Sequence, residues 1–252
     1  MTGGWTYGDP VARQVLFIYN DPSAPEALLG DAFAESGFDV SAFGVVAPDA
    51  VDEPAIGVDF PDPARFDVIV PLGSRWAVYD KRLPWVDAEI GMVRRALDAG
   101  VGVLGVCFGG QLLSRALGGA VTRCATPEIG WREVRSDDHA LVPPGPWFQW
   151  HFDTFTVPPD AQRIADNDCA VQAFAQGRAL GLQFHPEVDE HLVARWIAED
   201  HDGDIARLGL DAEMLRARTA VEAGDAARRL RVLVRGFLRL LEGDQHRTDR
   251  LG

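Results

Sequence analysis

Cys107 is the residue of this chain whose surroundings best suit nucleophilic chemistry. It follows an apolar run at residues 101–106, precedes a stretch with helical spacing, and has Gly105 and Gly109 two positions away on either side. A tight turn from strand to helix projects such a side chain, and glycines give room where a Cβ would clash. At a helix N-terminus the dipole favours the thiolate, and free N–H groups, here that of Phe108, can hold an oxyanion.

The alternative for Cys107 is a small buried residue at the end of a strand, because most free cysteines only fill space in a core. Glycine-rich turns from strand to helix also bind phosphates or serve packing alone. Cys124 and Cys169 have no such glycines beside them and are predicted to be structural. Three cysteines at wide, irregular spacing predict neither a disulfide framework nor a zinc site, so we expect no metal.

A reactive Cys107 needs a base, and His185 is the best candidate. It ends an apolar run at residues 179–184, and Glu187 follows two positions later, after a proline. An imidazole can take the proton of a thiol and pass it to a leaving amine, and a carboxylate fixes the tautomer of the imidazole. His185 and Glu187 are therefore candidates for the base and its orienting acid. The alternative is a surface histidine beside an ordinary acid.

His151 is the rival base, because aromatic and acidic residues surround it in Trp150-His151-Phe152-Asp153. We expect it on the wall of the pocket. The remaining histidines stand in polar or helical surroundings and are expected on solvated faces. They are His139, His191, His201 and His246.

The elements that position these residues follow an alternating pattern. Apolar strand-like runs lie at residues 14–19, 38–46, 67–72 and 101–106, and helical patterns lie at residues 26–36, 85–99 and 111–117. This alternation predicts an α/β domain with a mostly parallel central sheet and helices on both faces. Sites in such sheets form at the carboxyl ends of the strands, where Cys107 and His185 both fall.

The pattern changes after Gly118. Short β-like segments at residues 131–134, 154–157, 171–175 and 179–184 predict a small antiparallel extension of the sheet. The chain reads as helical from residue 188 onward, with apolar residues at helical spacing over residues 208–242. We expect these C-terminal helices to pack on the domain's own sheet, and docking of a partner is the alternative.

Composition limits the partners. The chain has 252 residues, of which 47% are apolar, which suffices for one substantial core. A net charge of −14 leaves no basic field, so nucleic acid and anionic membranes are not expected as partners. The first ten residues lack a signal-peptide pattern, and no apolar run is long enough to span a bilayer, so we expect a cytoplasmic protein.

The paired motifs resemble those of the class I glutamine amidotransferases. In that family the triad cysteine lies in Gly-x-Cys-x-Gly-x-Gln, and the histidine and glutamate lie in His-Pro-Glu; residues 105–111 and 185–187 match these patterns. Residues 128–131, 150–155 and 172–174 are similar to the stand-alone, GMP-synthase-like members. The resemblance implies a flavodoxin-like fold, with the amidotransferase domain over residues 1–200 and a C-terminal helical extension over residues 201–252, packed on the same domain.

The resemblance also implies a reaction without a cofactor. Cys107 would attack the side-chain amide of L-glutamine, His185 would give a proton to the departing ammonia, and water would hydrolyse the glutamyl thioester. The residues implied to hold the glutamine are Gln111, His151, Phe152 and Asp153. A second oxyanion N–H would come from Gly73 or Ser74, in the loop that is Gly-Gly-Pro in the family. Arg75 replaces that proline, and either pairs with the substrate carboxylate or stays exposed.

The use of the ammonia is open. No Ser-Gly-Gly-type ATP pyrophosphatase loop and no Walker sequence follows residue 187, so an acceptor-activating synthetase would be a separate polypeptide. The alternative is a stand-alone hydrolase that uses the same triad on γ-glutamyl amides or small peptides. A catalytically silent binding subunit is a third hypothesis, against which the intact triad argues.

Overall fold

The computed structural model describes the backbone of residues 12–200 and 203–248, and side chains as far as residue 243. Three points of the sequence analysis therefore lie outside the described residues. They are the lack of a signal-peptide pattern in the first ten residues, His201, and the side chain of His246. No helix within the described ranges is long and apolar enough to cross a membrane.

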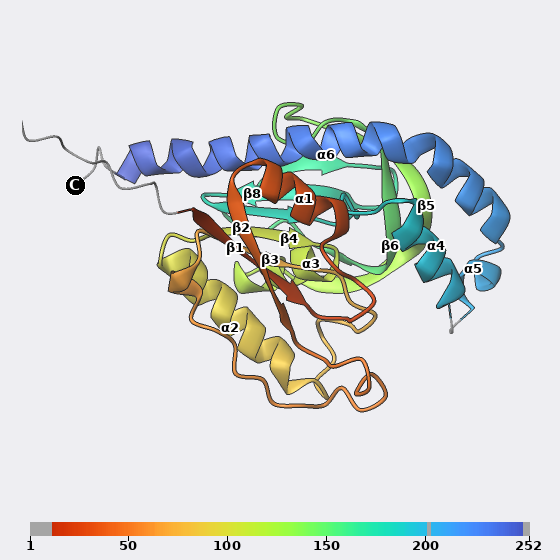
Figure 1. The fold of residues 1–252 in the computed structure, drawn as a ribbon, viewed down its shortest axis with the longest axis horizontal. Coiled ribbons are helices and arrows are strands. Elements are labelled where there is room, and N and C mark those ends of the chain that lie inside the picture. The colour runs from red at the N-terminus through yellow and green to blue at the C-terminus, as the bar shows by residue number, and fades with distance from the viewer. Residues whose placement is uncertain (1–11, 201–202, 249–252) are drawn as a thin grey trace, which may run out of the picture.

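A sheet of nine strands forms the centre of the described molecule, in the order β2-β1-β3-β4-β9-β8-β7-β5-β6 (Figure 1). The first half of this order is parallel and the second half antiparallel. The parallel strands are β2 (Phe38–Gly44), β1 (Arg13–Tyr19), β3 (Val68–Pro71), β4 (Gly102–Val106) and β9 (Ala179–Leu182). The others are β8 (Val171–Gln176), β7 (Gln162–Asp166), β5 (Val121–Ser136) and β6 (Gly145–Phe155).

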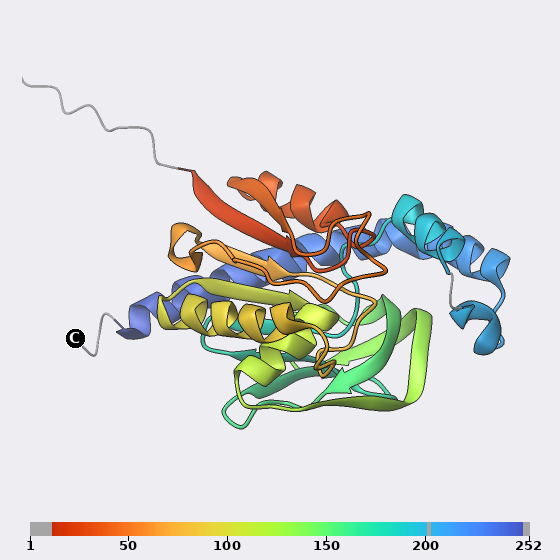
Figure 2. The same ribbon diagram turned by 90° about the horizontal axis from the view of Figure 1, so that it is seen from below.

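Helices cover both faces of the sheet, as predicted. The alternation of side chains along β1 divides the core, because successive residues of a strand point to opposite faces. Val15 and Phe17 pack with α1 (Ala27–Glu35) and α6 (Ala212–Thr248). Leu16 and Ile18 pack on the other side with α2 (Pro84–Asp98) and α3 (Phe108–Ala116). Figure 2 shows α2 and α3 on the side of the sheet opposite α6.

The long α6 contributes to two of the three apolar clusters. The main core between α6 and the sheet buries Leu230, Leu233, Val234 and Phe237. Its first turns join a third cluster with β5, β6, α4 (Glu190–Ala198) and α5 (Asp204–Arg207). Figure 1 shows α6 running along the whole length of the sheet. The region that the sequence predicted to be helical from residue 188 onward is divided into α4, α5 and α6, and a turn with Gly209 at φ +68° separates α6 from α5.

The antiparallel half differs from the prediction in length and in number of strands. β5 and β6 form a long hairpin, although the apolar pattern marked only residues 131–134 and 154–157 of it. β7 was not predicted, because only Ile164 and Ala165 are buried there. Polar strands of this kind are held by ladder hydrogen bonds to their neighbours and carry a weak apolar signal. A short 3-10 helix, η1 (Pro63–Arg65), completes the regular structure of the described chain.

Candidate active site

Cys107 sits at the sharp turn between β4 and α3. Its φ is +52°, which is unusual for a residue other than glycine and stores roughly 1–3 kcal/mol of strain. The flanking glycines are sterically required. A Cβ at Gly109 would lie 1.9 Å from the carbonyl oxygen of Pro71, and a Cβ at Gly105 would lie 2.4 Å from the carbonyl oxygen of Gly109. The predicted elbow is therefore present, and backbone packing enforces it.

Cys107 is 5% exposed, and its thiol lies near polar groups. Nε2 of Gln183 lies 3.8 Å from Sγ, and Sγ lies 3.9 Å from the carbonyl oxygen of Trp150. The backbone N–H of Cys107 donates to the carbonyl of Leu182 at 2.9 Å, which joins the turn to the end of β9. Phe108 is the first residue of α3, so its N–H has no partner within the helix.

His185 and Glu187 follow the end of β9, the strand beside β4. Nδ1 of His185 lies 2.6 Å from Oε1 of Glu187, and both side chains are buried. The N–H of His185 donates to the carbonyl of Phe148 at 2.8 Å, and the ring packs edge-on against Trp196 at 4.9 Å between centroids. Burial by itself would lower the pKa of His185, but the negative charges of Glu187 and Cys107 outweigh it and raise that pKa well above its ordinary value.

A cavity of about 430 Å³ opens over these residues. Cys107 and His185 line it together with Gly73, Trp150 and Trp196. Carboxyl side chains make up much of the remaining wall. They are Asp21, Asp52, Glu199, Asp200 and Asp204.

The loop after β3 forms another part of the wall, and the end of β1 holds it. Asn20 Nδ2 donates to the carbonyl of Leu72 at 3.2 Å, at the start of the loop. Asp21 accepts the backbone N–H of Arg75 at 3.1 Å and its guanidinium at 2.6 Å. Burial would raise the pKa of Asp21, but the bonds from Arg75 and Ser23 keep it below its usual value. The structure thus pairs Arg75 with a carboxylate of the protein itself.

Sequence reasoning missed Asn20 and Asp21, which lie between the predicted strand at residues 14–19 and the predicted helix at residues 26–36. Both are buried, at 0% and 2% exposure. Their position directly after a parallel strand was the available signal, because the carboxyl ends of such strands meet at one edge of the sheet.

The four residues predicted to hold glutamine do not line the cavity. Gln111 is buried behind Cys107, and its Nε2 donates to the carbonyl of Asp153 at 3.1 Å and to Gln183 at 3.4 Å. The carboxylate of Asp153 accepts the hydroxyl of Tyr79 at 2.9 Å. Phe152 packs beneath the guanidinium groups of Arg123 and Arg207.

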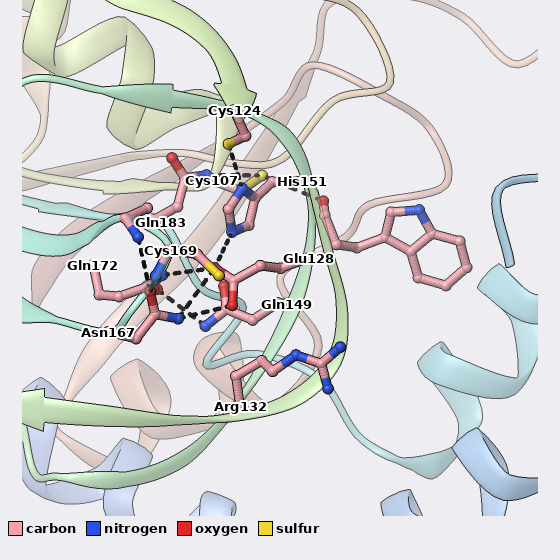
Figure 3. Close-up of polar contacts among 12 residues, drawn as sticks. Cys107, Cys124, Glu128, Arg132, Gln149, His151, Asn167, Cys169, Gln172 and Gln183 are labelled. Carbon is pink, nitrogen blue, oxygen red and sulfur yellow. Dashed lines mark hydrogen bonds and ion pairs between the residues drawn. The ribbon is translucent and has the colours of Figure 1, made fainter. Parts of the chain in front are cut away.

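His151 belongs to a buried polar network rather than to the pocket wall (Figure 3). Its Nδ1 lies 3.5 Å from Cys124 Sγ, and its Nε2 lies 3.2 Å from Glu128 Oε2. Asn167 also donates to Glu128, at 2.8 Å. Burial raises the pKa of the Cys124 thiol to about 12, so this cysteine stays a thiol. Cys124 therefore has the structural surroundings that the sequence predicted.

The other histidines and possible ligand clusters add no second site within the described residues. His139 and His191 are exposed, as predicted. Groups of three or more His, Cys, Asp or Glu side chains suited to a metal ion are absent from the described parts of the chain.

Comparison with known protein families identifies the domain that contains the Cys107 turn. Residues 73–197 match the family Glutamine amidotransferase class-I, and this span contains Cys107, His185 and Glu187. The chain carries a class I glutamine amidotransferase domain. The resemblance inferred from the two motifs is thereby confirmed, together with the predicted α/β fold.

Curated relatives of this amidotransferase domain are glutamine-hydrolysing GMP synthases. That of Mycolicibacterium paratuberculosis is 32% identical over 151 residues, which cover 57% of this chain and 28% of the relative. That of Thermus thermophilus is 33% identical over 138 residues, covering 49% of this chain and 25% of the relative. The chain therefore spans less than a third of the length of the curated relatives it matches.

Solved amidotransferase structures match nearly the whole chain. A glutamine amidotransferase from Thermotoga maritima superposes with a TM-score of 0.78 at 26% identity, covering 92% of this chain and 100% of that one. A glutamine amidotransferase from Methylobacillus flagellatus gives a TM-score of 0.79 at 22% identity, with 91% and 96% coverage, and supports the fold.

Proposed function

We propose that the protein hydrolyses the side-chain amide of glutamine, with Cys107 as nucleophile, His185 as general acid and base, and Glu187 as orienting acid. The observation that carries the proposal is the strained Cys107 turn in one cavity with a histidine that is paired to a buried carboxylate at 2.6 Å. Nucleophile, base and orienting acid in this relation are the requirements of amide cleavage through a covalent intermediate.

The proposed first half-reaction releases ammonia. His185 takes the thiol proton, the resulting thiolate of Cys107 attacks the side-chain carbonyl carbon of glutamine, and the carbonyl π electrons move onto oxygen. The C–N bond then breaks, the oxygen re-forms its double bond to carbon, and His185 gives its proton to the departing nitrogen. Glu187 stabilises the imidazolium that exists between these two transfers. A glutamyl thioester remains on Cys107.

The second half-reaction regenerates the thiol. Water attacks the thioester carbonyl and gives one proton to His185. The C–S bond breaks, His185 returns the proton to Sγ, and glutamate leaves. Both tetrahedral intermediates carry an oxyanion, for which we propose the N–H of Phe108 and an N–H of Gly73 or Ser74 as donors.

The glutamine site involves residues behind the nucleophile. Gln111 contacts Gln183, which in turn contacts Cys107 Sγ, so Gln111 supports the nucleophile from behind. His151, Phe152 and Asp153 follow Trp150, whose carbonyl faces the thiol. We propose that these residues shape the glutamine site through Trp150 and Gln183. Direct contact of the four with glutamine stays a prediction.

Transfer of the ammonia to a separate synthetase is the favoured use of the product. The curated relatives that this chain matches are named glutamine-hydrolysing GMP synthases, which supports a synthetase as the user of the ammonia. The division of the chain at residue 200, the cytoplasmic location and the absence of a cofactor also stay predictions.

A second candidate is hydrolysis of other γ-glutamyl amides without a partner. The cavity wall favours it, because its five carboxyl side chains outnumber the one arginine of the wall, Arg75, and the excess negative charge attracts a substrate whose leaving amine carries a further positive charge. Glutamine has no such charge on its leaving group.

Release of ammonia and glutamate from glutamine tests the assignment of the nucleophile. We expect wild type and Cys169→Ala to turn over equally, since Cys169 is exposed and outside the cavity. Cys107→Ala should lose activity by roughly 10³-fold or more. Turnover surviving in Cys107→Ala would contradict the proposal.

A substrate panel separates the two candidates. Glutamine is compared with γ-glutamyl amides of neutral amines and of diamines, in wild type and Cys107→Ala. Glutamine turnover that rises with an added synthetase supports ammonia transfer. Fast cleavage of the cationic amides with inert glutamine supports the stand-alone hydrolase.

A further inference from the structure

Glu89 is a buried acid that the proposed reaction does not use. It lies on α2 with an exposure of 0%, on the helix face that also buries Trp85 and Met92. Its hydrogen-bond partner is Asn20, whose Nδ2 lies 3.2 Å from Oε1 of Glu89. An ionised carboxylate in such surroundings, without a cation beside it, is strongly disfavoured.

Asn20 connects Glu89 to the loop beside the nucleophile. Both hydrogens of its Nδ2 are used, one toward Glu89 and one toward the carbonyl of Leu72, each at 3.2 Å. The side chain therefore spans from α2 to the end of β3. Because Asn20 is buried at 0% exposure, no solvent competes for these bonds.

Two atoms of this pair have no partner among the described residues. They are Oδ1 of Asn20 and Oε2 of Glu89. Both are acceptors when Glu89 is ionised, and two unsatisfied buried acceptors cost roughly 1–3 kcal/mol each. Protonation converts an oxygen of Glu89 into a donor, and Oδ1 is the unpaired acceptor of the asparagine to which Glu89 is already hydrogen-bonded.

Burial also favours the neutral form of Glu89. It raises the pKa of this carboxyl to about 8, and among the described residues the hydrogen bond from Asn20 is the influence that opposes this shift. No charged group of the described elements around α2 contributes to this shift.

The direction of the Leu72 carbonyl matters for catalysis. The carbonyl of Leu72 and the N–H of Gly73 belong to one planar trans peptide, so fixing the oxygen also fixes the N–H on its opposite side. In this loop the N–H of Leu72 donates to the carbonyl of Ile18, and the N–H of Arg75 donates to the carboxylate of Asp21. Gly73 is in close contact with His185, since a Cβ on it would lie 3.0 Å from Cε1 of the ring.

We propose that Glu89 acts as a neutral carboxylic acid that holds Asn20, and that Asn20 in turn aims the N–H of Gly73 at the oxyanion. Asn20 and Glu89 are then positioning residues for the reaction. The inference rests on the proposed function for its catalytic consequence. The protonation of Glu89 can be tested without it.

Kinetics of three variants test the catalytic consequence. Glu89→Gln keeps a donor for Oδ1 of Asn20 and should retain kcat within about twofold of wild type. Glu89→Leu removes that donor and should lower kcat about 10–100-fold, less than the roughly 10²–10³-fold of a lost oxyanion donor, with a smaller change in KM. Asp87→Asn, an exposed acid on the same helix, is the matched control and should behave as wild type.

The pH profile separates positioning from general packing. Wild-type kcat should fall as pH rises through about 8, where Glu89 ionises, and Glu89→Gln should lack this fall. Alkylation of Cys107 by iodoacetamide at neutral pH should be equal in all variants. Equal impairment of Glu89→Gln and Glu89→Leu, or full activity of Glu89→Leu, overturns the positioning role.

Infrared spectroscopy tests the protonation state independently of turnover, even if Glu89→Leu fails to fold. The wild-type minus Glu89→Gln difference at pH 6.5 should contain the C=O stretch of a protonated carboxyl, and raising the pH above about 8 should remove it. Absence of that band at pH 6.5 overturns the inference. If the band is present but the protein does not hydrolyse glutamine, the protonation of Glu89 is supported and the proposed function is rejected.

Discussion

Oε1 of Glu187 lies 2.6 Å from Nδ1 of His185, and the two side chains are buried together beside the Cys107 thiol. The pair leaves Nε2 as the imidazole nitrogen for proton transfer with Cys107. A carboxylate in this relation fixes the tautomer and stabilises the imidazolium formed during the reaction.

Removing the charge of Glu187 should therefore impair turnover more than binding. We expect Glu187→Gln to lower kcat by about 10²–10⁴-fold with little change in KM, because the amide favours the wrong tautomer of His185. Glu190→Gln, an exposed acid of the same segment, is the control and should retain activity. Steady-state kinetics with glutamine provide the measurement, and near-normal kcat in Glu187→Gln would remove Glu187 from the mechanism.

The same variant should change the titration of His185. The charges of Glu187 and Cys107 raise the pKa of this imidazole against the effect of burial, so Glu187→Gln should lower it. Imidazole ¹⁵N chemical shifts followed against pH measure the pKa directly. An unchanged pKa would mean that the charge of Glu187 does not stabilise the imidazolium form of His185.

The Cys107 turn should tolerate no side chain at Gly109. A Cβ there would lie 1.9 Å from the backbone carbonyl of Pro71, so Gly109→Ala must displace β3 or α3. We expect a loss of about 3 kcal/mol or more in the free energy of unfolding, together with loss of activity.

Gly224→Ala is the matched comparison for that substitution. It lies within α6 with no atom inside 4 Å of a Cβ, and should stabilise the protein by about 0.5–1 kcal/mol. Urea unfolding of both variants measures the contrast. Equal effects would show that the packing of the turn is not the cause.

Glu89 should make the stability of the protein depend on pH in a defined window. Its pKa is raised from 4.5 to about 8 in the folded state, so its contribution is complete below pH 4.5 and is lost as pH rises toward 8. Between these values wild type should lose at most about 1.4 kcal/mol per pH unit relative to Glu89→Gln. Unfolding free energies of both proteins from pH 5 to pH 8 measure the difference. A constant difference would mean that Glu89 titrates normally.

The reacting residues were predictable because their signals are local. Cys107 between its glycines, and His185 with a carboxylate two residues later, carry their chemistry within a few positions of the chain. The strands that end at these residues are apolar on both faces, which makes the parallel half of the sheet easy to predict.

Position relative to the cavity was not predictable in the same way. His151 was expected on the pocket wall, but the side chains of β6 alternate. Trp150 faces the cavity, and His151 points to the opposite side, toward Cys124 and Glu128. The sequence places both residues near the site and does not say which of the two faces it.

Residue patterns thus identified the nucleophile, its base, the family and the α/β class, since each depends on short-range spacing or on the apolar period. Tertiary structure decided the pairing of β4 with β9, which brings Cys107 next to His185 although four antiparallel strands lie between them in the sequence. It also decided the burial of Glu89 against Asn20. On sequence alone an acid in an amphipathic helix reads as solvated, and only the packing of α2 against the end of β1 removes it from water.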